Sequence, residues 1–495
     1  MNNTTSKKSS NFQQALWLGI GQFCTFAISF ISAAILSRIL DKTEYGTYKQ
    51  ILYIYVTLQS LFTAGLPSVF SYFIPRLEVG QQKKLISSLN RIFLIIGTIL
   101  SIILFAGSSL IADILKNPEL SIGLKLFSPF PLFTLPTMGV EGIYTAIRET
   151  KKLAKYHIFS KAIMLVGIVL PVVLLGAKYE YAIIGWGAAS FAIFIVAMYM
   201  KNRPYVSIKK MEIPNMYKSI FSYSTPLIGA FIGGFAISLA DQFFISRYYG
   251  TVAFADYSNG CLNIPFAIMI TSSVKNVLLP LLSKADATGE LQTAFKTYQN
   301  AVNKSIILIF PLLVLCFVST EDIMVFLYGS QYSSSSIYMK SYIIREFTHV
   351  LPYFSVLMAT GLSNKYMTMH IWGAIYIWVA GFVITQLELD AFIIVLAHSL
   401  FYFFCSIYAF ICIYNKTKFK LINFDILKVI IAVLSHSAIC GFIALQFNYH
   451  IYHSEIPIIN LVIMSCVFYA TLISTGKLLH INYLESITRI IKKKI

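Results

Sequence analysis

Charged and amide side chains inside otherwise apolar segments are the residues of this chain whose types could do chemistry. A charged side chain at the middle of a membrane span costs about 2.5–3.5 kcal/mol on insertion scales, so it should face an aqueous cavity or a partner. Basic groups placed in this way can hold an anion, and an arginine can grip phosphate oxygens with two parallel hydrogen bonds. Carboxylates can take a cation or a proton, and amides can bind hydroxyl groups. No catalytic geometry is visible among these residues.

The candidates form three groups. The basic ones are Arg38, Arg247, Lys275 and Arg345. The carboxylates are Glu141 and Asp241. The amides are Gln22, Gln242, Asn259, Asn263 and Asn276.

Each basic candidate also has a purely structural interpretation. Arg38 and Arg247 lie at equivalent ends of two predicted helices, where an arginine can reach the membrane interface or cap the helix. Lys275 has a four-carbon stem that could reach the headgroups. Arg345 and Glu346 could mark an outer-face helix start or pair with neighbours. The sequence leaves both interpretations open for all four.

The carboxylates and histidines have structural alternatives too. Glu141 could make a hydrogen bond between helices, and Asp241 could be the counter-ion of an arginine. Three histidines in apolar segments, His349, His398 and His436, are interpreted as core residues with satisfied hydrogen bonds.

Composition places the chain in a membrane. It has 495 residues, of which 57% are hydrophobic and only 12% are charged, whereas soluble domains carry about 25% charged residues. The mean hydropathy is +0.71. The net charge of +18 comes from basic residues in short segments between apolar ones, which argues against a nucleic-acid partner. The seven cysteines lie within apolar segments, so we expect neither a metal site nor a disulfide.

About 20 apolar residues are needed to cross a bilayer as a helix. This rule predicts fourteen spans and an all-α polytopic membrane protein. The expected spans are 15–36, 50–73, 92–113, 126–146, 158–176, 181–200, 219–246, 261–282, 305–328, 338–361, 367–386, 391–414, 427–447 and 456–477. With the N-terminus in the cytoplasm, most of the 39 lysines and arginines fall on the cytoplasmic side, so both termini are expected there.

Part of the sequence is repeated. Residues 26–38 (FAISFISAAILSR) recur as 235–247 (FAISLADQFFISR), and Lys152 with His157 recurs as Lys365 with His370. The two offsets are nearly equal, which indicates a duplicated unit of about 210 residues. Six spans per copy give parallel repeats related by an axis along the membrane normal.

The duplication predicts the domain organisation. We expect an N-lobe at 1–210 (helices one to six), a C-lobe at 211–420 (helices seven to twelve) and two appended helices at 421–480. A basic amphipathic tail is expected at 481–495. It could lie on the anionic inner leaflet or be a solvated basic end.

Two short motifs resemble a known family. The first span ends in Ser37-Arg38-Ile39-Leu40 and is followed by Glu44-Tyr45-Gly46-Thr47-Tyr48. A second element reads Phe326-Leu327-Tyr328-Gly329 with Gln331-Tyr332. These motifs and the 6+6+2 layout resemble the Wzx-type polysaccharide and O-antigen flippases of the multidrug/oligosaccharidyl-lipid/polysaccharide exporter superfamily. The second copy departs from the first motif, since Ala255-Asp256-Tyr257 replaces Gly-Thr-Tyr.

The resemblance implies a function. The protein would move an undecaprenyl-diphosphate-linked oligosaccharide from the inner to the outer leaflet of a bacterial plasma (inner) membrane by alternating access through a cationic central cavity. The glycan would enter O-antigen, capsule or exopolysaccharide assembly, where a polysaccharide polymerase and a chain-length regulator are possible partners. The basic candidates would hold the diphosphate, the amides would contact the glycan, and the carboxylates would couple ions. No cofactor and no enzymatic activity are expected.

Two other classes remain as alternatives. A cation-coupled multidrug exporter of the same superfamily usually has twelve spans and an acidic site for its substrates. A membrane polysaccharide polymerase or glycosyltransferase generally carries a large external loop with catalytic residues, whereas the loops predicted here are short.

Overall fold

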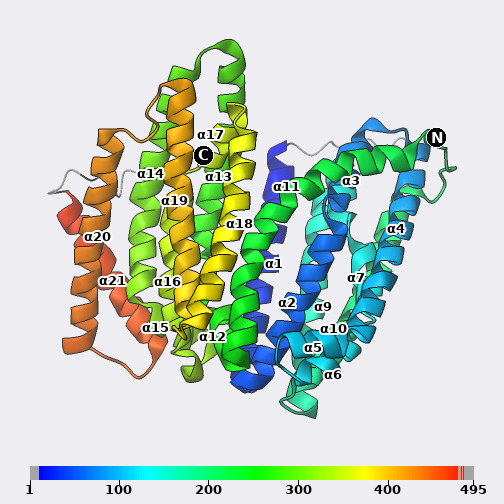
Figure 1. The fold of residues 1–495 in the computed structure, drawn as a ribbon, viewed down its shortest axis with the longest axis horizontal. Coiled ribbons are helices and arrows are strands. Elements are labelled where there is room, and N and C mark those ends of the chain that lie inside the picture. Colours follow the sequence, from blue (N-terminus) through cyan, green and yellow to red (C-terminus); the bar gives the residue numbers. More distant parts are fainter. Residues whose placement is uncertain (1–10, 478–480, 482, 484–495) are drawn as a thin grey trace. The chain divides into compact units, whose positions relative to one another are not determined.

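The computed structural model describes residues 11–477, Ile481 and Tyr483, and every regular element among them is a helix. Figure 1 shows these helices coloured along the chain. Long apolar helices are the expected outcome, because a helix satisfies all of its backbone hydrogen bonds internally and lipid offers none. The all-α membrane fold predicted from hydropathy is confirmed. Apart from Ile481 and Tyr483, the tail expected at 481–495 lies outside the described residues.

The chain divides into two compact units. Unit 1 contains the residues up to Phe235 together with Ser246–Ala255, and unit 2 contains Ala236–Ile245 and the residues from Asp256 onward. The lobe boundaries expected at 210/211 and 420/421 stay predictions.

Unit 1 holds ten helices and most of an eleventh. Their bounds are α1 (Asn11–Ile39), α2 (Lys42–Thr63), α3 (Leu66–Phe73), α4 (Val79–Ala106), α5 (Ser108–Ile114), α6 (Glu119–Phe127), α7 (Pro131–Thr134), α8 (Val140–Ala146), α9 (Thr150–Leu175), α10 (Tyr179–Asn202) and the first part of α11 (Met216–Phe244). Within this unit α9 packs against both α1 and α10.

Unit 2 begins inside α11 and continues to the end of the described chain. Its further helices are the second half of α12 (Gly250–Gly260), α13 (Pro265–Thr288), α14 (Leu291–Val318), α15 (Thr320–Tyr328), α16 (Ser335–His349), α17 (Tyr353–Ala359), α18 (Ser363–Gln386), α19 (Phe392–Thr417), α20 (Phe424–His450) and α21 (Pro457–Gly476). Here α16 packs against α19, and α20 packs against α14 and α21.

The expected count of fourteen spans is not confirmed. Among the described residues, ten helices are long and apolar enough to cross a membrane, and an eleventh span forms if α2 and the segment Leu66–Arg76, bent by 49° between them, are counted together. The expected fourth span, 126–146, is divided into short pieces around Pro136 and Gly139, and the tenth, 338–361, is divided at Pro352. Proline removes a backbone donor and collides with the preceding turn, and Gly139 has a positive φ of 89°, so both features favour a break at these places. Proline does not always end a helix here, since α9, α13 and α14 continue through Pro171, Pro280 and Pro311.

The two copies of the repeat break at corresponding places. In the first copy α1 ends at Ile39 and α2 begins at Lys42; in the second, a π-helical turn (Ile245–Tyr249) separates α11 from α12. The second echo also matches, because α9 and α18 each begin two residues before the repeated lysines Lys152 and Lys365.

The motif after α1 is a structural junction in unit 1. The Asp41 carboxylate caps α2 by accepting hydrogen bonds of 2.8 and 2.9 Å from backbone N–H groups of its first turn. Glu44 Oε2 accepts a 2.7 Å hydrogen bond from the backbone N–H of Tyr179 at the start of α10. Gly46 lies so close to the carbonyl oxygen of Thr251 that a Cβ atom would collide with it. The motif therefore requires glycine for close packing.

The second copy replaces this packing with a different contact. Asp256, at the position equivalent to Thr47, accepts hydrogen bonds of 2.9 Å from the hydroxyls of both Ser334 and Ser335 at the start of α16. The departure from the motif thus gives unit 2 its own polar anchor between α12 and α16.

One fully buried charge holds the divided fourth segment. Lys201, in the last turn of α10, is 0% exposed. Its ammonium donates hydrogen bonds to Asn90 Oδ1 (2.5 Å), the Met138 carbonyl (2.7 Å) and the Pro136 carbonyl (3.0 Å), and it lies 4.7 Å from the centroid of the Phe70 ring. The ammonium satisfies carbonyls that the broken helix leaves without backbone donors, so Lys201 acts structurally.

Candidate functional site

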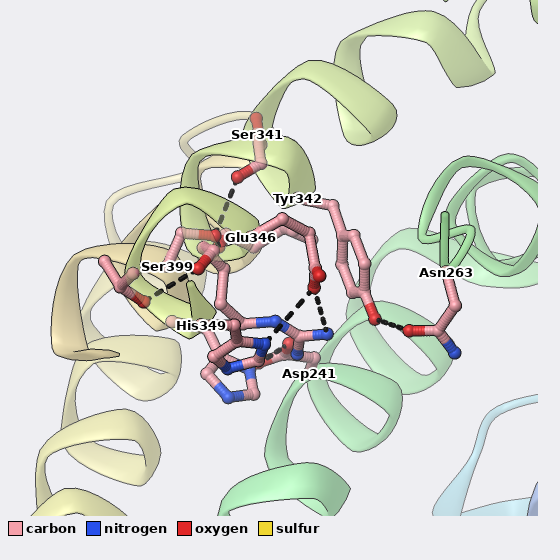
Figure 2. Close-up of polar contacts among 11 residues, drawn as sticks. Asp241, Asn263, Ser341, Tyr342, Glu346, His349 and Ser399 are labelled. Atoms are coloured by element: carbon pink, nitrogen blue, oxygen red, sulfur yellow. Dashed lines mark hydrogen bonds and ion pairs between the residues drawn. The ribbon is translucent and has the colours of Figure 1, made fainter. Parts of the chain in front are cut away.

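A polar cluster in unit 2 contains several of the predicted site residues (Figure 2). Asp241 of α11 and His398 of α19 lie 2.5 Å apart, measured from Oδ2 to Nδ1, and both residues are about 95% buried. Asp241 Oδ1 and His398 Nε2 find no hydrogen-bond partner among the described residues. The pair thus has an unused acceptor on the carboxylate and an unused nitrogen on the ring, so it has room for a proton or a cation.

Arg345 lies beside this pair but its charge is already compensated. On α16, Arg345 Nη2 and His349 Nδ1 each lie 3.4 Å from Glu346 Oε1. The guanidinium also stacks on the Tyr342 ring, 3.9 Å from its centroid. The sequence left the partner of Arg345 unnamed, and the structure places Glu346 there. Arg345 therefore offers an anion less free charge than an unpaired arginine would.

Lys275 is in a different position. It lines a pocket of about 320 Å³ in unit 2 together with His349, His370 and three tyrosines, and no carboxylate among the described residues lines this pocket. Lys275 is thus the basic candidate of unit 2 that is best placed to meet an anion.

The predicted amides of unit 2 are dispersed. Asn263 Oδ1 accepts a 2.6 Å hydrogen bond from the hydroxyl of Tyr342, as Figure 2 shows. Asn259 is 1% exposed, whereas Asn276 is exposed on α13 next to Lys275. Gln242 donates a 3.2 Å hydrogen bond to the Ser238 carbonyl of its own helix. Asn263 and Asn276 are therefore the two exposed amides on α13 or immediately before it.

The candidates of unit 1 do not join this cluster. Arg38 and Gln22 are exposed on α1, and Glu141 is exposed in the first turn of α8. Arg247 donates a hydrogen bond to the carbonyl of Ile114 at the end of α5. For Arg247 this contact matches the helix-capping alternative. The four basic candidates are divided between the units, with Arg38 and Arg247 in unit 1 and Lys275 and Arg345 in unit 2.

Unit 1 contains a basic pocket that the sequence analysis missed. Lys49 of α2 and Lys161 of α9 line one cavity of about 260 Å³, together with Ser29 and Ser32 of α1 and Trp186 of α10. No carboxylate lines this cavity. We call it the Lys49–Lys161 pocket.

The polar groups of the Lys49–Lys161 pocket are cations, an indole N–H and hydroxyls. The Lys49 ammonium lies 5.1 Å from the centroid of the Tyr45 ring, and the indole N–H of Trp186 is buried without a hydrogen-bond partner in the described chain. Both ammonium groups lose hydration in this cavity and gain no carboxylate partner there, so the pocket favours an anion.

The sequence held a partial signal for this pocket. Lys161 stands inside the apolar run of the predicted span 158–176. Lys49 directly precedes the predicted span 50–73, so hydropathy places it in a loop, whereas the Asp41 cap starts α2 at Lys42. The cap moves Lys49 into the second turn of a helix. A metal site is not found, since no group of three potential ligands exists among the described residues.

The comparisons with known proteins agree on family and fold. A family model described as polysaccharide biosynthesis protein matches residues 35–337. The structure is similar to that of the lipid II flippase MurJ in an inward closed conformation, with a TM-score of 0.68 and 13% identity over 94% of this chain and 99% of that one. It is also similar to an inward-facing multidrug resistance MATE transporter of the MOP superfamily (TM-score 0.61, 12% identity, 82% of this chain and 99% of that chain).

A third solved structure has a similar fold, and the search of curated proteins by sequence finds no match. The structure of a MOP superfamily transporter from Pyrococcus furiosus has a TM-score of 0.55 and 11% identity over 82% of this chain and 96% of that one. No curated protein matches by sequence. At these identities the structural likeness establishes a shared fold.

Proposed function

The chain belongs to the polysaccharide biosynthesis protein family, and from that premise we propose that it moves a lipid-linked oligosaccharide with a diphosphate headgroup across a bacterial plasma membrane. Transport runs from the inner to the outer leaflet, with the binding groups exposed to one face at a time. The lipid is an undecaprenyl chain, and the glycan enters O-antigen, capsule or exopolysaccharide assembly, next to a polymerase and a chain-length regulator. Both termini are cytoplasmic, and the protein is a carrier rather than an enzyme.

The observation that carries this proposal is the Lys49–Lys161 pocket. Its two ammonium groups face no carboxylate, and the buried N–H of Trp186 still needs an acceptor. A diphosphate is a compact anion with several acceptor oxygens, so it can meet all three donors at once. A cationic drug would meet repulsion at the same place, which disfavours the multidrug-exporter alternative.

Lys275 supplies a second basic pocket of the same kind in unit 2. Each unit therefore carries a cationic pocket of its own. In the proposed cycle, Arg345 acts on the headgroup together with Glu346 and His349 rather than as an isolated positive charge. The reason is that Glu346 balances the charge of Arg345. Among the glycan-binding candidates, Asn276 is exposed next to Lys275, and Asn263 is exposed just before the start of α13.

The membrane potential favours the proposed direction. Moving one elementary charge across 100 mV is worth about 2.3 kcal/mol, so a headgroup with two negative charges gains roughly twice that when it leaves a negative interior. The emptied cationic pockets are drawn inward by the same field. Asp241 with His398 adds a site for proton or cation coupling, since each has an atom without a partner.

The test is the sidedness of the lipid-linked oligosaccharide in spheroplasts, read with an impermeant probe for the glycan. Without the protein, the glycolipid should accumulate on the inner face, out of reach of the probe. Restoring the wild-type chain should expose it, and the Lys49→Met, Lys161→Met double variant should not. Equal exposure with and without the protein would reject flipping and make cationic drug efflux the leading alternative.

A further inference from the structure

A third polar pocket lies in unit 2, away from the residues already discussed. It has a volume of about 520 Å³, within the range of small-molecule sites, and is lined by residues of α15, the end of α20, the following loop and the start of α21. Three carboxylates line it, those of Glu321, Asp322 and Glu455, together with His450 and His453, and among the described residues no lysine or arginine does. Its charge is therefore opposite to that of the two basic pockets, and it does not suit a diphosphate.

The pocket wall is held in place by Asn460. The Asn460 side chain is 2% exposed, and its Nδ2 donates to Asp322 Oδ1 (3.1 Å) and to the Ser454 carbonyl (2.9 Å). Its Oδ1 accepts from the Ser454 backbone N–H at 2.9 Å. These bonds fix the α20–α21 loop against α15. They engage only one oxygen of Asp322, and the other makes no hydrogen bond within the described chain.

Asn448 points to a missing ligand. It lines the same pocket, it is only 8% exposed, and its Oδ1 has no hydrogen-bond partner among the described residues. A buried amide oxygen without a donor is unfavourable and calls for an explanation. A bound molecule that brings hydroxyl or amine donors would supply the partner.

The remaining lining residues narrow the chemistry of that molecule. Val318, Val325, Leu445 and Met464 form an apolar side of the pocket, and Tyr449, which is 77% exposed, stands at its rim. A sugar ring combines an apolar C–H face with hydroxyl donors, and it fits such a mixed lining. A metal ion is a weaker occupant, because the described residues contain no group of three potential ligands.

We propose that this pocket binds a sugar ring, either neutral or bearing an amine, on the side of the membrane that the charge pattern predicts to be outside. The three carboxylates exclude sugars that carry an acidic group. That this sugar belongs to the transported glycan rests on the proposed function. The pocket would then hold the glycan after its headgroup has crossed.

Saturation-transfer-difference NMR on the purified full-length protein in detergent tests the proposal directly. The probes are glucosamine, glucose and glucuronate, each added at the same concentration. Signal should be transferred to the rings of glucosamine and glucose and be weak or lacking for glucuronate. Asn448→Leu should weaken binding about fivefold, the effect of one lost hydrogen bond, and Asp322→Asn should reduce the preference for the amine.

Controls keep the outcome decisive. Asp390→Asn changes an exposed carboxylate in the α18–α19 loop that does not line the pocket, and it should bind sugar like the wild type. If Asn448→Leu does not fold, Glu455→Gln replaces it, because the Glu455 side chain is exposed and its loss should not affect folding. The proposal would be overturned by no signal transfer to any sugar or by a preference for glucuronate. It would also be overturned if Asn448→Leu (or its replacement Glu455→Gln) and Asp322→Asn both bound the sugars like the wild type.

The same preparations separate this inference from the proposed function. Pyrophosphate binding reports on the basic pockets, which share no lining residue with this one. If the protein binds sugar here but flipping fails in spheroplasts, the pocket stands as a saccharide site without the flippase assignment. If flipping holds but no sugar binds, the pocket assignment alone is lost.

Discussion

Replacing Lys161 with methionine removes one ammonium group from the Lys49–Lys161 pocket while keeping an unbranched side chain of similar length. A charge-assisted hydrogen bond contributes about 1.5–3 kcal/mol in proteins. Since about 1.4 kcal/mol is a factor of ten in affinity, Lys161→Met should weaken binding of a diphosphate about 10- to 100-fold. The Coulomb energy of two unit charges at 4 Å is about 4 kcal/mol at an effective dielectric constant of 20. Both lysines are only partly buried, so solvent screens the Coulomb energy, and the expected loss of binding energy is about 1.5–3 kcal/mol rather than about 4 kcal/mol.

The same substitution should have the opposite effect on the stability of the ligand-free protein. Lys49 and Lys161 are like charges in one cavity without a carboxylate. Removing either charge relieves the cost of taking an ammonium group partly out of water. The melting temperature without ligand should therefore stay the same or rise, while the stabilisation by added diphosphate should shrink. A lysine that only supported the fold would lower the melting temperature when replaced.

The assay is calorimetric titration of the detergent-purified protein with inorganic pyrophosphate and with a short-chain prenyl diphosphate, combined with thermal unfolding of each variant. Lys155→Met is the matched control, because Lys155 lies on the same helix and is exposed outside the pocket. Raising the salt concentration should weaken binding to the wild type more than to the variant, since the wild type holds more charge at the site.

Two results would refute this reasoning. One is an unchanged affinity for both diphosphates in Lys161→Met and in the double variant with Lys49→Met. The other is a drop in the melting temperature of the ligand-free protein with no loss of binding, which would make the two lysines structural. The two losses need not add, because both lysines would contact one ligand.

Three further substitutions test other parts of the structure. Asp241→Asn removes the carboxylate of the buried acid–histidine pair, and the transport rate should fall while pyrophosphate binding stays unchanged, whereas an unchanged transport rate would exclude coupling there. Arg345→Ala should reduce complementation of flipping about tenfold, and Arg345→Lys should reduce it less, because lysine keeps the charge beside Glu346. Full complementation by Arg345→Ala would exclude Arg345 from the site. Gly46→Val should lower thermal stability by several degrees through the collision with the Thr251 carbonyl, whereas Gly19→Val, where a Cβ meets nothing within 4 Å, should have little effect.

Sequence reasoning identified the family because the signal was local. The junction at Glu44–Tyr48 and the element at Phe326–Tyr332 resemble the motifs of the family to which the chain belongs. The structure adds the reason for the first motif, since Gly46 meets a backbone carbonyl and Glu44 holds the start of α10. These contacts link segments far apart in the chain, so a single sequence does not show them.

The same reasoning located Asp241, Lys275 and Arg345 as charges in apolar segments, but not their partners. Whether a charge is free depends on what packs against it. Glu346 neutralises Arg345 from the adjacent position, and His398 meets Asp241 from a helix 157 residues later. The expected fourth and tenth spans are divided near Pro136 and Pro352, which hydropathy does not register. A proline alone does not predict such a break, because α9, α13 and α14 continue through theirs.

By itself the sequence determined the all-α membrane class and most of the long helices, and it indicated the duplication. Lipid leaves backbone polar groups no partner outside the helix, so hydropathy predicts where helices form, although not where a span is broken into short pieces. Tertiary structure decided which charges face a cavity. Lys49 and Lys161 are 112 positions apart, on α2 and α9, and only helix packing brings both into one pocket without a carboxylate. Which side chains of different helices meet in one cavity depends on how the helices pack side by side. Hydrophobic periodicity does not predict that packing.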